Sequence, residues 1–270
     1  MKKQYRELPL SNDFIFGEVM RRPDICKLFL ESLLGREIER IEYISKQQDL
    51  SESGASHGIR LDIYLKDSKN KVYAVEMQTT SRRKVQMRVR YYQGMIDRHN
   101  LEKGMSYADL PESFIIMVCT WDIFGRGQPV YRRKLTLHGC EDIEYDDGTH
   151  LYFLNTAYEK AGAPAAVMEF LRCIRENDVN EADYKTELMK KICPVMVELR
   201  NDPGKEAEYM MWEAKVMDIR YDERENGIQI LIRALQKIPL DRETVAGTVA
   251  REYGLSEEEA EEKVAEYWAE

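Results

Sequence analysis

Three polar side chains in one short segment combine residue types and a spacing that could bind a metal ion. In "RLDIYLKDSKNKVYAVEMQ", residues 60–78, apolar residues alternate on both sides of a polar turn, which predicts a β-hairpin. If the turn is centred on Lys69, Asp62 faces Glu76 across the two strands. Opposed Cβ atoms in such a pair lie about 4.5 to 5.5 Å apart, so the two carboxylates repel each other unless a positive charge lies between them.

Magnesium is the natural cation for such a pair, because it prefers oxygen ligands and is commonly held by one or two carboxylates, with waters and phosphate oxygens as the other ligands. Gln78 follows Glu76 by two residues and therefore projects from the same face, where it could orient a water or a phosphate oxygen. The alternative is a solvent-facing hairpin whose acids pair with nearby lysines. A register shifted by one residue would place the two acids on opposite faces.

The pattern around the hairpin predicts the elements that position it. Caps at Ser11 and Asn12 and a break at Pro23 predict two short helices before the hairpin, and residues 81–100 have the spacing of a third helix after it. The run "FIIMVCTW", residues 114–121, is continuously apolar and predicts a strand buried on both faces. Further strands are expected in "VYRRKLTLH", and "DIEY" and "HLYFLN" are expected to form a hairpin around "DDGT".

Three regions follow from these patterns. Residues 1–160 mix strands and helices and predict an α/β core, in which helices flank a mixed central sheet. Residues 163–225 predict an all-helical extension, with Met210, Met211 and Trp212 in its core. Residues 226–270 predict an acidic pair of helices, the first ending at Gly254 and the second opening with a capping box.

Composition narrows the classes of protein. No signal-peptide pattern and no run of about 18 apolar residues is present, so we expect a cytoplasmic protein that does not span a membrane. The five cysteines form no CxxC pair and the four histidines never come at ligand spacing, so each cysteine is expected to pack as a small apolar group rather than in a disulfide or zinc site. The glycine motifs of phosphate-loop, dinucleotide-binding and serine-hydrolase proteins are missing.

Charge is distributed unevenly along the chain. The formal net charge is -9, but residues 241–270 hold ten acidic and three basic residues, a net -7. Residues 79–103 hold seven basic and two acidic residues, a net +5, so the segment that follows the hairpin could bind an anionic polymer. The C-terminal helix pair has the outline of a helix-turn-helix, but phosphates would repel the five glutamates within residues 257–262 of its second helix, which favours a contact with protein or an autoinhibitory role.

Six segments in one order resemble the PD-(D/E)XK nuclease family transposases, also called recombination-promoting nucleases. The resemblance runs from about Asp13 to Arg224 and is carried by "NDFIF", "RLDIYLKD", "YAVEMQ", "RVRYYQGMI", "KGMSYADLPESFIIMVCTWDIFG" and "NDPGKEAEYMMWEA". It implies a restriction-endonuclease-like core and metal-dependent cleavage of DNA. The wider superfamily usually has lysine at the position of Gln78, and glutamine can donate a hydrogen bond there but brings no charge.

The resemblance also implies roles for particular residues. Asp62 and Glu76 would bind Mg²⁺, for which Mn²⁺ could substitute, with Gln78 and an upstream acid completing the catalytic set. That acid is Asp13, which matches the family's opening motif, or Glu18 on the same helix. The basic residues after the hairpin would hold the DNA backbone through contacts that weaken with salt, and they are Arg82, Arg83, Lys84, Arg88 and Arg90. Arg88 and Tyr91 match the family's arginine and tyrosine pattern, which adds Tyr91 to the expected DNA-binding residues.

Two functions are therefore weighed. The first is a magnesium-dependent DNA endonuclease of transposition or recombination, which hydrolyses phosphodiester bonds without a covalent protein intermediate. The second is a catalytically silent relative that keeps the fold and binds nucleic acid or protein. DNA is one expected partner. The chain could also form a homodimer or bind a protein partner through the acidic C-terminal helices.

Overall fold

The computed structural model describes residues 4–43, 48–50, 59–79 and 85–268 of the 270-residue chain. The chain divides into two compact units, residues 1–202 and residues 203–270, and each is described by itself. The first unit is built on a six-stranded mixed sheet. In their order across the sheet, its strands are β1 (Ile41–Tyr43), β4 (Ile63–Asp67), β5 (Val72–Gln78), β6 (Ser113–Cys119), β10 (Thr149–Asn155) and β7 (Val130–Arg132).

The three central strands β5, β6 and β10 run parallel, and the other neighbours in the sheet are antiparallel. Every residue of β5 and of β6 is buried, as expected for parallel strands covered on both faces. This confirms the prediction for the apolar run at residues 114–121. Two small antiparallel pairs lie outside this sheet: β2 (Gln48–Leu50) with β3 (Ile59–Leu61), and β8 (Thr136–Leu137) with β9 (Cys140–Glu144).

The predicted hairpin is formed by β4 and β5. Its register pairs Ile63 with Val75 and Leu65 with Tyr73, which is the alignment expected from a turn centred on Lys69. The turn is held by Asp67, whose Oδ1 accepts hydrogen bonds from the backbone N–H groups of Lys69 and Lys71, both at 2.9 Å. The alternation of apolar residues and this turn therefore determine the register together.

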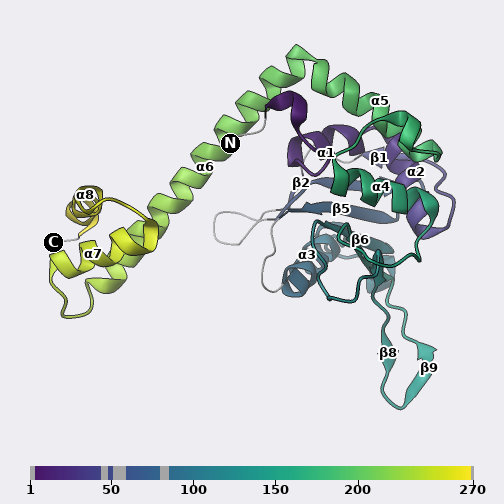
Figure 1. The fold of residues 1–270 in the computed structure, drawn as a ribbon. Helices are drawn as coiled ribbons and strands as arrows, with labels where there is room; N and C mark the ends of the chain where they lie inside the picture. Colours follow the sequence, from purple (N-terminus) through teal and green to yellow (C-terminus); the bar gives the residue numbers. More distant parts are fainter. Residues whose placement is uncertain (1–3, 44–47, 51–58, 80–84, 269–270) are drawn as a thin grey trace. The chain divides into compact units, whose positions relative to one another are not determined.

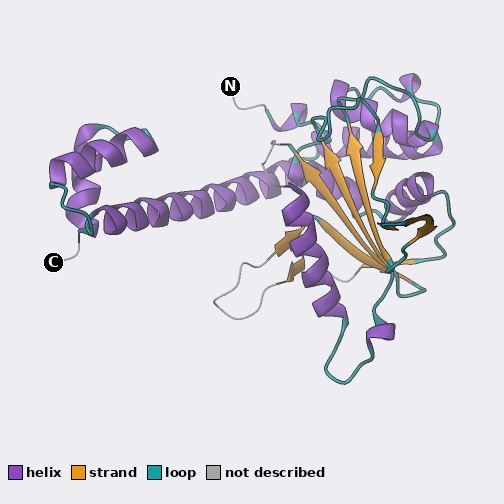
Figure 2. Cartoon of the chain, turned by 90° about the horizontal axis from the view of Figure 1, so that it is seen from below, coloured by secondary structure: helices purple, strands orange, loops and turns teal. Residues whose placement is uncertain are grey.

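Helices cover both faces of the sheet. Figure 1 shows α1, α2, α4 and α5 on one side and α3 on the other, and Figure 2 shows α3 crossing the second face. Phe29 of α2 and Phe170 of α4 pack with their ring centroids 4.8 Å apart. The helices are α1 (Asp13–Met20), α2 (Pro23–Leu34), α3 (Val85–Asn100), α4 (Ala165–Glu176) and α5 (Glu187–Asn201), with short 3-10 helices at Tyr5–Glu7, Tyr107–Asp109 and Glu181–Asp183.

The two helices predicted at the start of the chain are confirmed, together with the residues that begin and end them. The side chain of Asn12 accepts hydrogen bonds from the N–H groups of Phe14 and Ile15, which caps α1. Pro23 stands at the first turn of α2, where its missing N–H does no harm, and Gly35 ends that helix with φ of 65°. The fold class predicted from the sequence, a mixed sheet flanked by helices and followed by further helices, is confirmed.

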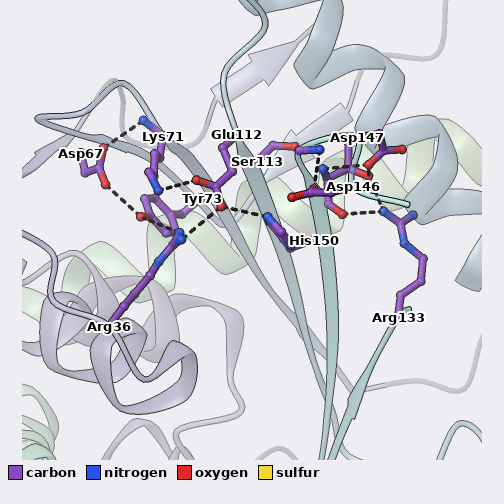
Figure 3. A network of polar contacts seen from close by, with 12 residues as sticks. Arg36, Asp67, Lys71, Tyr73, Glu112, Ser113, Arg133, Asp146, Asp147 and His150 are labelled. Atoms are coloured by element: carbon purple, nitrogen blue, oxygen red, sulfur yellow. Dashed lines mark hydrogen bonds and ion pairs between the residues drawn. The ribbon is translucent and has the colours of Figure 1, made fainter. Parts of the chain in front are cut away.

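A polar network closes the sheet at the N-terminal ends of the parallel strands (Figure 3). Glu112 accepts a hydrogen bond from Arg36 at 3.1 Å, lies 2.9 Å from Nε2 of His150, and forms an ion pair with Lys71. Burial would raise the pKa of Glu112, but hydrogen bonds from Lys71 and Arg36 hold it below its usual value. The network ties this end of the sheet to the start of the loop after α2 and leaves the opposite end for the acids of the hairpin.

The second predicted hairpin is wrong. Residues 150–155 belong to β10, which pairs with β6 and β7 in the central sheet, whereas residues 142–144 belong to β9, which pairs with β8. The physical reason is burial: Leu151, Phe153 and Leu154 place apolar groups on both faces, and only a central strand can cover both. A turn signal alone does not distinguish a hairpin from a strand that enters another sheet.

The second unit consists of α6 (Pro203–Leu235), α7 (Arg242–Tyr253) and α8 (Glu257–Tyr267), whose core includes Ile228, Val249 and Val264. The predicted helix pair at the C-terminus is confirmed: Gly254 ends α7 with φ of 61°, and Ser256 opens α8 in a capping box with Glu259.

Met210 and Met211 were expected in the core of the extension but are 63% and 75% exposed. Consecutive residues point about 100° apart on a helix, so Met210, Met211 and Trp212 cannot share one buried face. Cys140 is also exposed, whereas the other four cysteines are buried as predicted. Within the described part of the chain, no helix is both long and apolar enough to cross a membrane.

The division of the chain into a core, a helical extension and a C-terminal helix pair stays a prediction. In the structure α4 and α5 pack against α1 and α2, which places them in the first unit. Helix α6 continues without a break through residues 225 and 226.

Candidate active site

The two hairpin acids meet where the second strand of the hairpin ends. Asp62 lies at a bend between β3 and β4, and the register of β4 and β5 carries it to a position opposite Glu76. The backbone N–H of Asp62 donates to Oε1 of Glu76 at 2.9 Å, and Oδ2 of Asp62 accepts from the backbone N–H of Met77 at 2.9 Å. These two reciprocal hydrogen bonds hold both carboxylates at one point, on the face of the sheet that α3 covers.

Glu76 lies in an electrostatically unfavourable place. It is 3% exposed, and burial, followed by the charge of Asp62, raises its pKa well above its usual value. The hydrogen bond from the backbone of Asp62 and the positive charge of Arg88 act in the opposite direction. A buried carboxyl beside a second carboxyl accommodates its charge best when a cation is bound, so this pair has the donor chemistry of a Mg²⁺ site.

One of the two upstream acids, Asp13, lies close enough for its charge to act on Glu76. It is the first residue of α1, is exposed, and contributes to the raised pKa of Glu76. Glu18, one and a half turns further along α1, forms an ion pair with Arg21 at 2.8 Å. The structure thus brings Asp13, Asp62 and Glu76 into one electrostatic group, although no cluster of three acid, histidine or cysteine side chains at metal-binding geometry occurs among the described residues.

Gln78 stands two residues beyond Glu76 and is 8% exposed. Its Nε2 donates to the carbonyl oxygen of Met77 at 2.8 Å, and its Oε1 accepts a hydrogen bond from the guanidinium of Arg88. Arg88 comes from α3, and its guanidinium also lies 5.5 Å from the ring centroid of Tyr92. Arg88 therefore brings to Gln78 the positive charge that glutamine itself lacks.

The predicted DNA-contacting residues fall into two groups. Arg82, Arg83 and Lys84 lie outside the described residues. Arg88 points to Gln78, and Tyr91 is 42% exposed on the outer face of α3.

Sequence analysis did not assign a role to Asp122, which organises the loop after β6 beside the site. Its Oδ1 accepts from the N–H groups of Phe124 at 3.0 Å and Gly125 at 2.9 Å and from the hydroxyl of Tyr131 at 2.6 Å. Its Oδ2 accepts from the N–H of Gly127 at 2.6 Å. Asp followed by glycines is a turn signal, and "WDIFGRG" contained it.

Comparison with known proteins gives one match. A family model described as PD-(D/E)XK nuclease family transposase matches residues 11–226. The matched region contains the hairpin, α3, the remaining strands of the sheet and the first part of α6. No curated protein and no solved structure gives a significant match.

Proposed function

The chain belongs to the PD-(D/E)XK nuclease family transposases, and we propose on that premise that it is a metal-dependent DNA endonuclease that acts in transposition or recombination. The observation that carries the proposal is the buried Glu76 carboxyl, which lies against Asp62 at the end of β5 and has a raised pKa. Buried like charges destabilise a fold, and enzymes use such arrangements at functional sites.

Asp62 and Glu76 would hold the ion, Mg²⁺ or in its place Mn²⁺, with Asp13 as the upstream acid. When bound, the ion supplies Lewis acidity toward a scissile phosphate and a water molecule. The protein supplies positioning: the hydrogen bonds of Met77 to Asp62 and of Asp62 to Glu76 fix both carboxylates before any ligand arrives.

Gln78 and Arg88 would act together beside the phosphate. The amide of Gln78 is fixed between the carbonyl of Met77 and the guanidinium of Arg88, so it can present a fixed dipole. Arg88 adds a positive charge that favours negative charge developing on the phosphate. We propose that Arg82, Arg83, Lys84 and Tyr91 hold the flanking DNA backbone.

The test of the metal site is a calorimetric titration of the full chain with Mg²⁺ and with Mn²⁺. We expect one site for wild type and at least a tenfold weaker affinity for Asp62→Asn, because Asn keeps an oxygen for the N–H of Met77 but removes the charge. Glu102→Gln changes charge equally at an exposed position and serves as the control. Wild-type protein that binds neither ion would favour the second function, a silent relative that binds nucleic acid or protein.

One observation favours that second function, namely the glutamine at position 78. Without lysine, turnover depends on Arg88, whose guanidinium must remain next to Gln78. A silent relative would bind DNA with the same salt dependence in the presence and absence of Mg²⁺ and would leave plasmid DNA intact.

We propose that the acidic helix α8 contacts another protein or weakens the binding of DNA. A homodimer of the chain is a further proposed assembly. Glu257→Gln, Glu258→Gln, Glu261→Gln and Glu262→Gln together remove four exposed charges and leave the capping residue Glu259 in place. We expect the DNA affinity of this variant to be equal to that of wild type or a few-fold higher at 50 mM salt, because repulsion from phosphates is lost. A large drop in DNA affinity would show instead that α8 reads DNA.

A further inference from the structure

A concave surface lies between α3 and the strands β10 and β7, on the face of the sheet that carries the candidate active site. It is a cavity of about 610 Å³, within the size range of small-ligand sites. Its floor consists of Tyr131, Leu151 and Phe153, and one wall is the side of α3 that carries Val89 and Asp97. We call it the α3 groove. It contains none of the residues Asp62, Glu76 and Gln78, and it opens on the same face of the sheet.

The course of the chain sets the direction of the groove. Helix α3 follows β5 and leads back to the start of β6, so its first turn stands at the active-site end of the sheet and its last turn at the opposite end. Arg88 in the second turn reaches Gln78, while Arg90 and Asp97 line the groove. At about 1.5 Å per residue, Arg90 and Asp97 are about 10 Å apart along the helix. A strand that leaves the active site therefore meets Arg90 first and Asp97 last.

The groove presents an aromatic surface that is held rigidly although it is exposed. Phe124 is 42% exposed, and its ring packs edge to face on Tyr131, with centroids 4.9 Å apart, and on Phe153, with centroids 5.4 Å apart. Its backbone is fixed by Asp122, which also accepts the hydroxyl hydrogen bond of Tyr131. Exposing a phenylalanine costs hydrophobic free energy, and a fixed exposed ring provides a platform on which a planar base can stack.

The end of the groove that is farther from the active site contains hydrogen-bond acceptors. Gln93 donates from Nε2 to Oδ1 of Asp97 at 2.7 Å and to the hydroxyl of Ser113 at 2.8 Å, which orients the Asp97 carboxyl. Asp147, which accepts from the N–H and hydroxyl of Thr149, lines the same end. Arg133 lines this end as well and donates to the carbonyl oxygen of Thr149 at 3.0 Å. The two carboxylates suit a ligand with hydrogen-bond donors, such as the exocyclic amino group of a base.

The groove also carries positive charge, from Arg90, Arg132 and Arg133. Arg90 is exposed, and no carboxylate of the described residues forms an ion pair with it. Cations, an exposed aromatic ring and carboxylates thus line one cavity, and a nucleotide carries the matching phosphate, planar ring and amino group.

We propose that the α3 groove binds one unpaired nucleotide whose base carries an amino group, with its phosphate at Arg90 and its base on Phe124. The inference rests on the proposed endonuclease function, since it makes DNA with an unpaired nucleotide next to the cut the preferred substrate. A base in a duplex would first have to leave its stack, whereas a mismatched or single-stranded base is already available.

The chain offers a matched pair of variants for blocking the groove. Gly94 lies on its α3 wall, and a Cβ at this position would meet no atom within 4 Å. Gly94→Ala adds only that carbon and leaves the groove open, whereas Gly94→Trp fills the groove from an exposed helix position. Both substitutions replace glycine within a helix, so neither should lower stability by itself.

The experiment measures binding of deoxycytidine monophosphate, thymidine monophosphate and deoxycytidine to the full chain by calorimetry in EDTA. We expect wild type and Gly94→Ala to bind deoxycytidine monophosphate equally, and Gly94→Trp and Phe124→Ala to bind it at least tenfold more weakly. Thymidine monophosphate, which has no amino group, should bind about tenfold more weakly. Wild type should bind deoxycytidine more weakly than deoxycytidine monophosphate, whereas Arg90→Ala should bind the two equally.

A second measurement compares cleavage of a paired duplex with cleavage of the same duplex carrying one unpaired cytosine. Wild type should prefer the unpaired substrate, and Gly94→Trp should lose the preference while it still cuts the paired duplex. Absence of nucleotide binding to wild type, or equal binding to Gly94→Trp, would overturn the groove assignment even if cleavage persists. Binding of the nucleotide by a protein that cuts no DNA would instead overturn the endonuclease function alone.

Discussion

Asp62→Asn and Glu76→Gln should each lower the rate of Mg²⁺-dependent nicking of supercoiled plasmid by about a hundredfold to a thousandfold or more. Each removes one of the two negative charges proposed to hold the ion, and loss of a single group that stabilises charge in a transition state costs about this much. Both variants keep an oxygen where the structure needs an acceptor: at Asp62 for the N–H of Met77, and at Glu76 for the N–H of Asp62. The lost activity can therefore be assigned to the charge.

The corresponding alanine variants should lose activity as well, but they would also leave buried N–H groups without acceptors, at about 1 to 3 kcal/mol of stability each. Melting curves of all variants and the activity of Glu102→Gln complete the comparison. Cleavage at the wild-type rate by Asp62→Asn or by Glu76→Gln, purified free of contaminating nuclease, would rule out the proposed metal site.

Glu76→Gln should also make the metal-free protein more stable at pH 8. Because burial and Asp62 raise the pKa of Glu76 in the folded state, the folded protein holds this proton more tightly than the unfolded chain does. The contribution of Glu76 to folding is then fully present below pH 4.5, the ordinary pKa of glutamate, and is lost as the pH rises through the folded value. We therefore expect the variant to be the more stable protein at pH 8, because its amide brings no second negative charge next to Asp62.

Urea unfolding in EDTA at pH 4 and pH 8 measures this effect. The difference between variant and wild type should be near zero at pH 4 and should favour the variant at pH 8. Mg²⁺ at a hundred times its dissociation constant should restore about 2.7 kcal/mol to wild type at pH 8 and little to the variant. The interpretation fails if the variant is less stable than wild type at pH 8, or if its advantage is the same at both pH values.

The hydrogen bond between Arg88 and Gln78 gives the departure from the superfamily pattern a physical meaning. A lysine at position 78 would carry its charge on β5 itself, next to Glu76. Here the charge comes from α3 and reaches the site through Gln78. Position 88 therefore couples the orientation of α3 to the charge at the site, and a shift of this helix would remove that charge.

The hairpin and its two acids could be predicted from the sequence because all the information is local. Alternation over residues 60–78 and a turn held by Asp67 specify one register, and a register specifies which side chains are opposed. The helix caps at Asn12 and Gly35 are local for the same reason. The family match then follows from segments that each carry such a local pattern.

The α/β class, the β4–β5 register and the meeting of Asp62 with Glu76 follow from local patterns, since each depends on residues close together in the chain. Tertiary packing, in contrast, brings β10 into the central sheet, the charge of Asp13 to Glu76, Arg88 to Gln78 and Phe124 to the wall of a groove. These features depend on how a helix or loop is turned toward the sheet, or on which strands pair within the sheet. Packing between distant segments sets both, and no spacing along the chain encodes them.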